Sequence, residues 1–305
     1  MDLDRREFLR ASGLVVLGAA AAACSDKGEN KTTGTLEELT RNKQNTMTVV
    51  PVQPPLARAN ERLSIGLISQ QGTPLSGGTA KAWLARTRKE KANGPIELVY
   101  HGDGFDGRGT YIARVTFAAE GDWLMYAEAR PHGSSKTLTG ATTLRVGERL
   151  GPPSGPKQPI PGERAISVPT PTTANPRSVK PICTRKPACT MHAVSLDQAL
   201  KAGKPTVLII GTPAFCETRY CGPVVDELMK VQAGPNGKKM SFVHVELYKD
   251  DVDAPATKDL APAAAAWHVE AEPVIYYINK AGTIADWAVG ASDAAEITQS
   301  ANALL

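Results

Sequence analysis

The sequence predicts a two-domain protein in which an all-β sandwich precedes an α/β domain. Its 305 residues exceed what one typical core requires. Residues 47–148 are short runs of alternating apolar and polar residues separated by glycine and aspartate, a pattern typical of antiparallel strands. Residues 182–305 instead alternate strand and helix patterns, and the proline-dense stretch 149–181 separates the two parts.

The composition is that of an ordinary soluble globular protein. Apolar residues make up 42% of the chain, charged residues make up 22%, and the formal net charge is +4. Lysine and arginine are spread along the chain rather than gathered in a run, so nucleic acid is not an expected partner. Nothing in the sequence indicates an oligomeric state.

Residues 1–24 resemble a bacterial export signal. Arg5 and Arg6 are followed by Glu-Phe-Leu-Arg, which resembles the twin-arginine motif, and then by an apolar run too short to span a bilayer. Cys24 closes a run of alanines, as in the box where lipoproteins are cleaved and acylated, although plain cleavage near this point is the alternative. A lipid on Cys24 would anchor the exported chain to the outer leaflet of the cytoplasmic membrane, in a compartment that permits disulfides.

Two stretches are expected to connect folded parts. Residues 25–46 are polar and poor in aromatic residues, which predicts a flexible spacer. Residues 149–181 are rich in proline and lack periodic apolar residues, which predicts an extended, semi-rigid linker.

The first domain is predicted to be an immunoglobulin-like β-sandwich, and its sequence does not indicate a function. Its stretch 109–129, GTYIARVTFAAEGDWLMYAEA, resembles the paired strands of bacterial immunoglobulin-like domains, which implies a sandwich and no particular chemistry. Its histidines and methionines show no ligand spacing, so we expect surface histidines at 101 and 132 and core methionines at 47 and 125. A copper-binding sandwich stays open as an alternative.

The second domain is predicted from its elements in order. Ser195 caps a short helix that ends at Gly203, and Pro223 opens a longer one. The remaining elements are strands at 205–210, 241–247, 274–278 and 284–288 and helices at 260–267 and 294–305, with Lys-Ala-Gly as a hairpin turn.

This order, with two cysteines after the first strand, resembles the thioredoxin-like superfamily. Phe215-Cys216 and Cys221-Gly-Pro are similar to the aromatic-Cys-Gly-Pro-Cys loop of thioredoxin, and the resemblance implies that Pro273 is its cis-proline. Two departures are clear. Four residues rather than two separate the cysteines, and Ile210 stands where thioredoxin has a buried carboxylate, so that carboxylate's role does not carry over.

The roles of the two cysteines stay open at this point. The resemblance implies that Cys216 attacks and Cys221 resolves, and the greater accessibility expected of Cys216 agrees. The helix dipole instead favours Cys221 as the thiolate, because it precedes the expected helix. The pair could also be a purely structural disulfide, or a copper site completed by His244 or His268.

Cys183 and Cys189 form a second pair, which we expect to be a structural disulfide. Cys189, Met191 and His192 could alternatively bind Cu(I), although nearby basic residues argue against it.

The sequence therefore predicts a membrane-tethered thiol–disulfide oxidoreductase that needs no cofactor and acts on protein thiols or disulfides. The alternatives are a non-catalytic thioredoxin-like adaptor with structural disulfides, and a copper-handling protein.

Overall fold

The computed structural model describes residues 34–152, 154–216, 218–250, 259–269 and 271–305. Residues 31–305 belong to one compact unit. The expected export signal, with Arg5, Arg6 and Cys24, lies outside the described residues. None of the helices in the described ranges has the length and apolar character needed to cross a bilayer.

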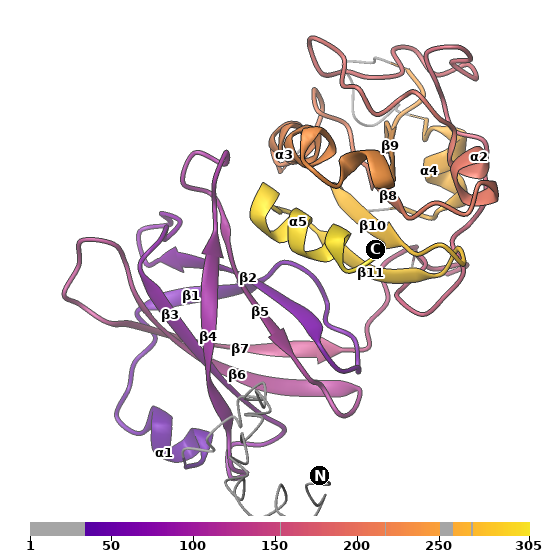
Figure 1. Ribbon diagram of the computed structural model, residues 1–305. Coiled ribbons are helices and arrows are strands. Elements are labelled where there is room, and N and C mark those ends of the chain that lie inside the picture. Colours follow the sequence, from indigo (N-terminus) through magenta and orange to yellow (C-terminus); the bar gives the residue numbers. More distant parts are fainter. Residues whose placement is uncertain (1–33, 153, 217, 251–258, 270) are drawn as a thin grey trace, which may run out of the picture. The chain divides into compact units, whose positions relative to one another are not determined.

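The first part is a seven-stranded antiparallel sheet (Figure 1). Its order is β1-β2-β5-β4-β3-β6-β7. The strands are β1 (Met47–Pro51), β2 (Glu61–Ser69), β3 (Thr79–Ala85), β4 (Asn93–His101), β5 (Thr110–Val115), β6 (Gly121–Arg130) and β7 (Leu138–Val146).

Strand β4 joins the two halves of this sheet. Its residues 93–98 pair with β3, whereas residues 99–101 pair with β5. The amide of Thr46 donates to the carbonyl of Thr139 (2.7 Å), which brings the start of β1 beside β7. The inward-facing residues form a single apolar cluster that includes Met47 and Met125, as predicted. His132 is exposed, but His101 is only partly exposed and lies 2.9 Å from a carboxylate oxygen of Asp293.

The described part of the expected spacer at 25–46, residues 34–46, is packed against the first sheet. It contains α1 (Leu36–Thr40), which opens with a capping box between Thr35 and Glu38. Leu36 is buried against Trp83 and Tyr126. Two backbone hydrogen bonds, from Glu37 N to Arg88 O and from Ala92 N to Gly34 O, also attach this segment to the loop between β3 and β4.

The proline-rich stretch 149–181 is packed rather than free. The amide of Gly162 donates to Ile284 O, the amide of Ile284 donates to Glu163 O, and Ala165 N donates to Gly282 O. Residues 162–165 therefore run along the edge of the second sheet. The sequence did not predict this packing, because contacts along one edge of a sheet require no periodic pattern of apolar residues.

The second part is built on a four-stranded sheet of order β11-β10-β8-β9. Strands β8 (Thr206–Ile210) and β9 (Ser241–Val245) are parallel, and β10 (Val274–Ile278) and β11 (Ile284–Val289) complete the sheet in antiparallel fashion. The helices are α2 (Leu196–Lys201), α3 (Cys221–Ala233), α4 (Pro262–Ala266) and α5 (Ala294–Asn302), with a short 3-10 turn η1 (Gly237–Lys239).

Alternate residues of β8 and β10 pack against different helices. Val207 and Ile209 pack in the cluster that contains α3 and α5, whereas Leu208 and Ile210 pack in the cluster that contains α2 and α4. All five residues of β8 are buried, as the apolar run predicts.

Two helix starts differ from the prediction. Helix α3 begins at Cys221, two residues before Pro223, so the cysteine belongs to the first turn. Ser195 precedes α2 as predicted, but its hydroxyl accepts from the amide of Thr170 (2.8 Å) instead of capping the helix.

A buried arginine ties β2 to α5. The guanidinium of Arg62 is fully buried and donates to both carboxylate oxygens of Glu296, one of them at 3.0 Å. It also donates to Gln53 Oε1 and to the carbonyl of Ala291. The charge is thus paired and hydrogen-bonded, as burial requires.

Candidate functional site

The two cysteines of residues 212–223 lie where β8 passes into α3. Gly211 follows β8 directly, and a Cβ added there would lie 3.3 Å from both Cys221 Sγ and Pro273 Cβ. The Glu272–Pro273 peptide bond is cis, as the resemblance implies. Glycine therefore allows the end of β8, the sulfur and the proline to meet at one point.

Cys216 carries the more acidic thiol. Its sulfur accepts from the amide of Cys221 (3.4 Å) and lies 3.1 Å from the hydroxyl of Thr218. The hydrogen bond from the Cys221 thiol is the largest influence that lowers the pKa of Cys216, to about 5. The Thr218 hydroxyl and the amides of Cys221 and Tyr220 act in the same direction, although burial opposes the shift. Cys216 is 9% exposed.

Cys221 is fully buried. Burial, and next the hydrogen bond that its thiol donates to Cys216, raise the pKa of Cys221 well above the ordinary value. The first amide of α3 belongs to Cys221 but points at the sulfur of Cys216. The helix start therefore favours the thiolate of Cys216, which corrects the dipole argument made for Cys221.

Glu272 brings a carboxyl to the two sulfurs, although the sequence analysis expected none because Ile210 occupies the position of thioredoxin's buried carboxylate. Its oxygen accepts from the amide of Thr212 (2.6 Å), and its carboxyl lies within 4.8 Å of both sulfur atoms. Burial, together with the negative charge of the Cys216 thiolate, raises the pKa of Glu272 to about 7. Glu272 lies in the segment before the cis-proline, far along the chain from Cys216. No sequence motif around Cys216 could therefore predict that this carboxyl belongs to the site.

A pocket of about 300 Å³ adjoins this pair, and Thr218, Tyr220 and Glu272 contribute to its wall. Tyr220 also donates its hydroxyl to the carbonyl of Arg108 (2.9 Å) and meets the ring of Phe105 edge-on. The loop between β4 and β5 thus supports the residue next to Cys221.

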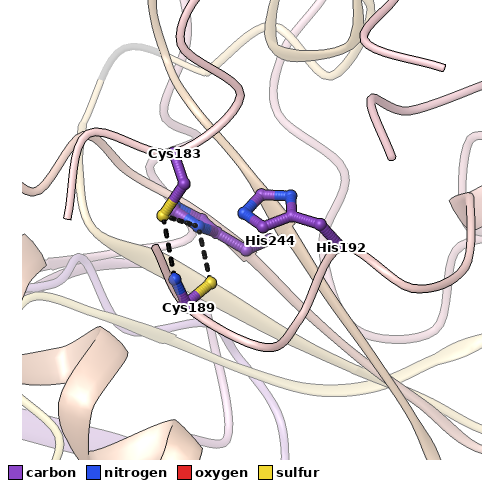
Figure 2. A group of neighbouring side chains, drawn as sticks. All are labelled: Cys183, Cys189, His192 and His244. Atoms are coloured by element: carbon purple, nitrogen blue, oxygen red, sulfur yellow. Dashed lines mark hydrogen bonds between the residues drawn. The ribbon is translucent and has the colours of Figure 1, made fainter. Parts of the chain in front are cut away.

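A second cluster gathers the other cysteine pair with two histidines (Figure 2). Cys183, Cys189, His192 and His244 are all buried, and one ligand atom from each lies within 4.8 Å of the others. Nδ1 of His244 lies 3.7 Å from Cys183 Sγ and 3.3 Å from Cys189 Sγ. The two cysteines are adjacent, as the predicted pairing requires, but the structure has them as free cysteines.

Neighbouring groups orient this second cluster. Nε2 of His244 donates to the carbonyl of Gly211 (2.9 Å), so its Nδ1 presents a lone pair to the sulfurs. The amide of Cys189 donates to Cys183 Sγ (3.3 Å). The buried carboxylate of Glu246 lies 3.9 Å from Nε2 of His244 and accepts from the amide of Thr184.

The expected copper ligands are distributed differently from the prediction. His244 faces Cys183 and Cys189 rather than Cys216 and Cys221, and His268 belongs to neither group of described metal-ligating residues. His192 joins the second cluster, as the Cu(I) alternative supposed, but with His244, which lies 52 positions further along the chain. The amide of His244 donates to Met191 O (3.0 Å), which places residue 191 beside β9 and so brings His192 close to His244.

No family model matches this chain, and no curated protein matches it with significance. A thiol:disulfide interchange protein of the thioredoxin family from Chlorobium tepidum TLS is 16% identical, with a TM-score of 0.28 over 46% of this chain and 99% of that chain. The Lin-41 filamin domain is 12% identical, with a TM-score of 0.21 over 33% of this chain and 92% of that chain. TM-scores this low support no statement on fold or function.

Proposed function

We propose that this chain exchanges disulfides with protein substrates through Cys216 and Cys221, in a thioredoxin-like part formed by residues 182–305. The observation that carries the proposal is the unequal setting of the two cysteines. Cys216 is the more exposed and has a pKa of about 5, whereas Cys221 is buried and its pKa is raised. A nucleophile and a resolving thiol need this difference.

The reaction balances with the groups at the site. The Cys216 thiolate attacks a substrate disulfide, forms a mixed disulfide and releases one substrate sulfur as a thiolate. Cys221 then loses its proton to the nearby carboxylate of Glu272 and attacks the Cys216 sulfur, which releases the second substrate thiolate. The protein dithiol is oxidised and the substrate disulfide is reduced. The reverse sequence oxidises a substrate dithiol.

The pocket beside Thr218 and Glu272 is the proposed place for the substrate segment. Thr218 and Tyr220, which line it, stand between Cys216 and Cys221 in the sequence, and Glu272, which also lines it, precedes cis-Pro273. We assign Pro273 the role of shaping this surface.

The proposed location is outside the cytoplasmic membrane. The twin-arginine motif at Arg5 and Arg6 would direct export, and acylation of Cys24 would tether the chain to the outer leaflet. The immunoglobulin-like part of residues 47–148 would then be a support for the reactive part, in a compartment where disulfides form.

Trapping of mixed disulfides tests the proposal. A full-length Cys221→Ser variant forms the first mixed disulfide but cannot resolve it. We expect it to accumulate covalent adducts with a disulfide-containing model protein, visible on non-reducing gels and lost on reduction. Cys216→Ser is the matched control, because it removes the nucleophile and keeps an equal number of thiols.

Adducts that depend on Cys216 support exchange. Equal trapping by both variants, or none by either at a pH well above 5, would contradict it and favour an adaptor whose cysteines only stabilise the fold.

A further inference from the structure

The second cluster has the composition of a closed metal site. Two thiols and two imidazoles converge from residues 183–192 and from strand β9, and no water-exposed position is left among them, since all four residues are buried. Structural zinc sites take four cysteine and histidine ligands in a tetrahedron, and an S2N2 set is typical of zinc.

The spacing of the ligand atoms fits such an ion. Zinc–sulfur distances of about 2.3 Å and zinc–nitrogen distances of about 2.0 Å put the S···N edge of a tetrahedron at roughly 3.5 Å. The two S···N distances to His244 are 3.7 and 3.3 Å, on either side of this value. The remaining ligand atoms are within 4.8 Å of one another, so small side-chain movements close the set.

His192 gives an independent indication of a ligand. His192 is 2% exposed, and neither ring nitrogen has a partner in hydrogen-bonding geometry among the described residues. Its ring centroid lies 5.0 Å from that of His244. A buried imidazole without a partner is costly, whereas a metal bond would satisfy one of its nitrogens.

The groups behind the ligands are those that metal sites use. His244 directs its Nδ1 at the sulfurs because its Nε2–H donates to Gly211 O, and ligating histidines commonly donate their second N–H to a carbonyl. The amide N–H of Cys189 donates a hydrogen bond to Cys183 Sγ, which stabilises negative charge on that sulfur. Two thiolates also balance the charge of a divalent cation, so the ion and its four ligands together carry no net charge.

From this geometry we infer that Cys183, Cys189, His192 and His244 bind one structural Zn²⁺ ion. The ion replaces two thiol protons, which pass to water, and excludes a Cys183–Cys189 disulfide while it is bound. It fastens residues 183–192 to β9. The hydroxyl of Thr184, which follows the first ligand, accepts from the amide of Ala214 (3.1 Å) in the segment that leads to Cys216, so the ion would also support that segment.

Metal content of the reduced full-length protein tests the inference. We expect one Zn²⁺ per chain after dialysis, by elemental analysis and native mass spectrometry, and a tetrahedral cobalt–thiolate absorption spectrum when Co²⁺ replaces it. The Cys183→Ser/Cys189→Ser variant should lose both signals. The matched Cys216→Ser/Cys221→Ser variant should keep them, although those sulfurs form the other candidate group with Glu272.

His192→Phe separates a ligand from a packed side chain. If His192 binds zinc, this variant weakens zinc binding by more than the roughly 10-fold to 100-fold that loss of an outer-shell partner costs, and its melting temperature falls. If no metal binds, removal of an unpartnered buried imidazole raises the melting temperature instead.

Chelation of the wild-type protein avoids dependence on variants that do not fold. We expect a chelator to lower the melting temperature and added Zn²⁺ to restore it. The inference is overturned if the reduced protein takes up neither Zn²⁺ nor Co²⁺, if it binds Cu(I) alone, or if the Cys216→Ser/Cys221→Ser variant is the one that loses the metal.

Discussion

Cys216 and Cys221 differ because only one of their sulfurs lies in front of the first turn of α3. The amide of Cys221 donates to the sulfur of Cys216, while the sulfur of Cys221 lies in the interior against Gly211. Sequence alone left the choice between them open, since it predicts the helix but not the direction of a side chain at its first residue.

Glu272 connects the site to the pH dependence of stability. Its pKa is about 7 in the folded protein, above the ordinary 4.5. Its contribution to stability is therefore complete below about pH 4.5 and is lost as the pH rises through about 7, because the buried carboxyl resists ionisation. Glu272→Gln removes this loss.

We therefore expect the unfolding free energy of Glu272→Gln, minus that of the reduced wild type, to increase between pH 4.5 and 7. The increase should be on the order of 2 kcal/mol, and urea unfolding at a series of pH values measures it. A difference that stays constant over this range would show that Glu272 has an ordinary pKa.

At the scale of elements, the close approach of β8 to the cis-proline segment depends on Gly211. A methyl group there would press on Pro273 and on Cys221 Sγ at 3.3 Å, and the proline ring has little freedom to move. Gly211→Ala should therefore lower the unfolding free energy by roughly 1–3 kcal/mol.

Gly222→Ala is the matched control for this prediction. A Cβ at Gly222, in the first turn of α3, meets nothing closer than 3.8 Å, so alanine should be neutral or stabilising by up to about 1 kcal/mol. Denaturant unfolding compares the two variants. Equal stabilities would contradict the close contact.

Elements with strong periodicity could be predicted from the sequence, and single contacts could not. The apolar runs placed β8 and β10 correctly. Leu36 shows the limit of this approach, because a buried leucine and a few backbone hydrogen bonds anchor a segment whose composition is that of a spacer. For a similar reason, the sequence analysis named the four residues of the second cluster but did not predict that they lie together. Residues 183–192 carry three of its members, but His244 joins them only through the contacts of β9.

At the scale of the whole chain, Arg62 and Glu296 link residues 234 positions apart in the sequence. Both side chains are buried, so removing one partner leaves the other charge uncompensated. Arg62→Met should lower the unfolding free energy by about 3–5 kcal/mol, and Arg62→Met/Glu296→Met should recover much of this loss.

Lys81→Met is the control for this prediction, because the Lys81–Glu97 pair has exposed side chains. Its loss should cost no more than about 1 kcal/mol. Urea unfolding of the three variants measures these effects. A small loss in Arg62→Met would contradict the buried pair.

The reduction potential of the Cys216–Cys221 disulfide tests the central claim most directly. The full-length protein is equilibrated in thiol buffers of defined potential, and the alkylated Cys216 and Cys221 peptides are counted by mass, separately from those of Cys183 and Cys189. A low thiol pKa stabilises the reduced form, so we predict a potential between about −120 and −270 mV, in the range of oxidoreductases. A disulfide with a potential below about −300 mV, reduced only when the protein unfolds, would contradict the proposed exchange reaction.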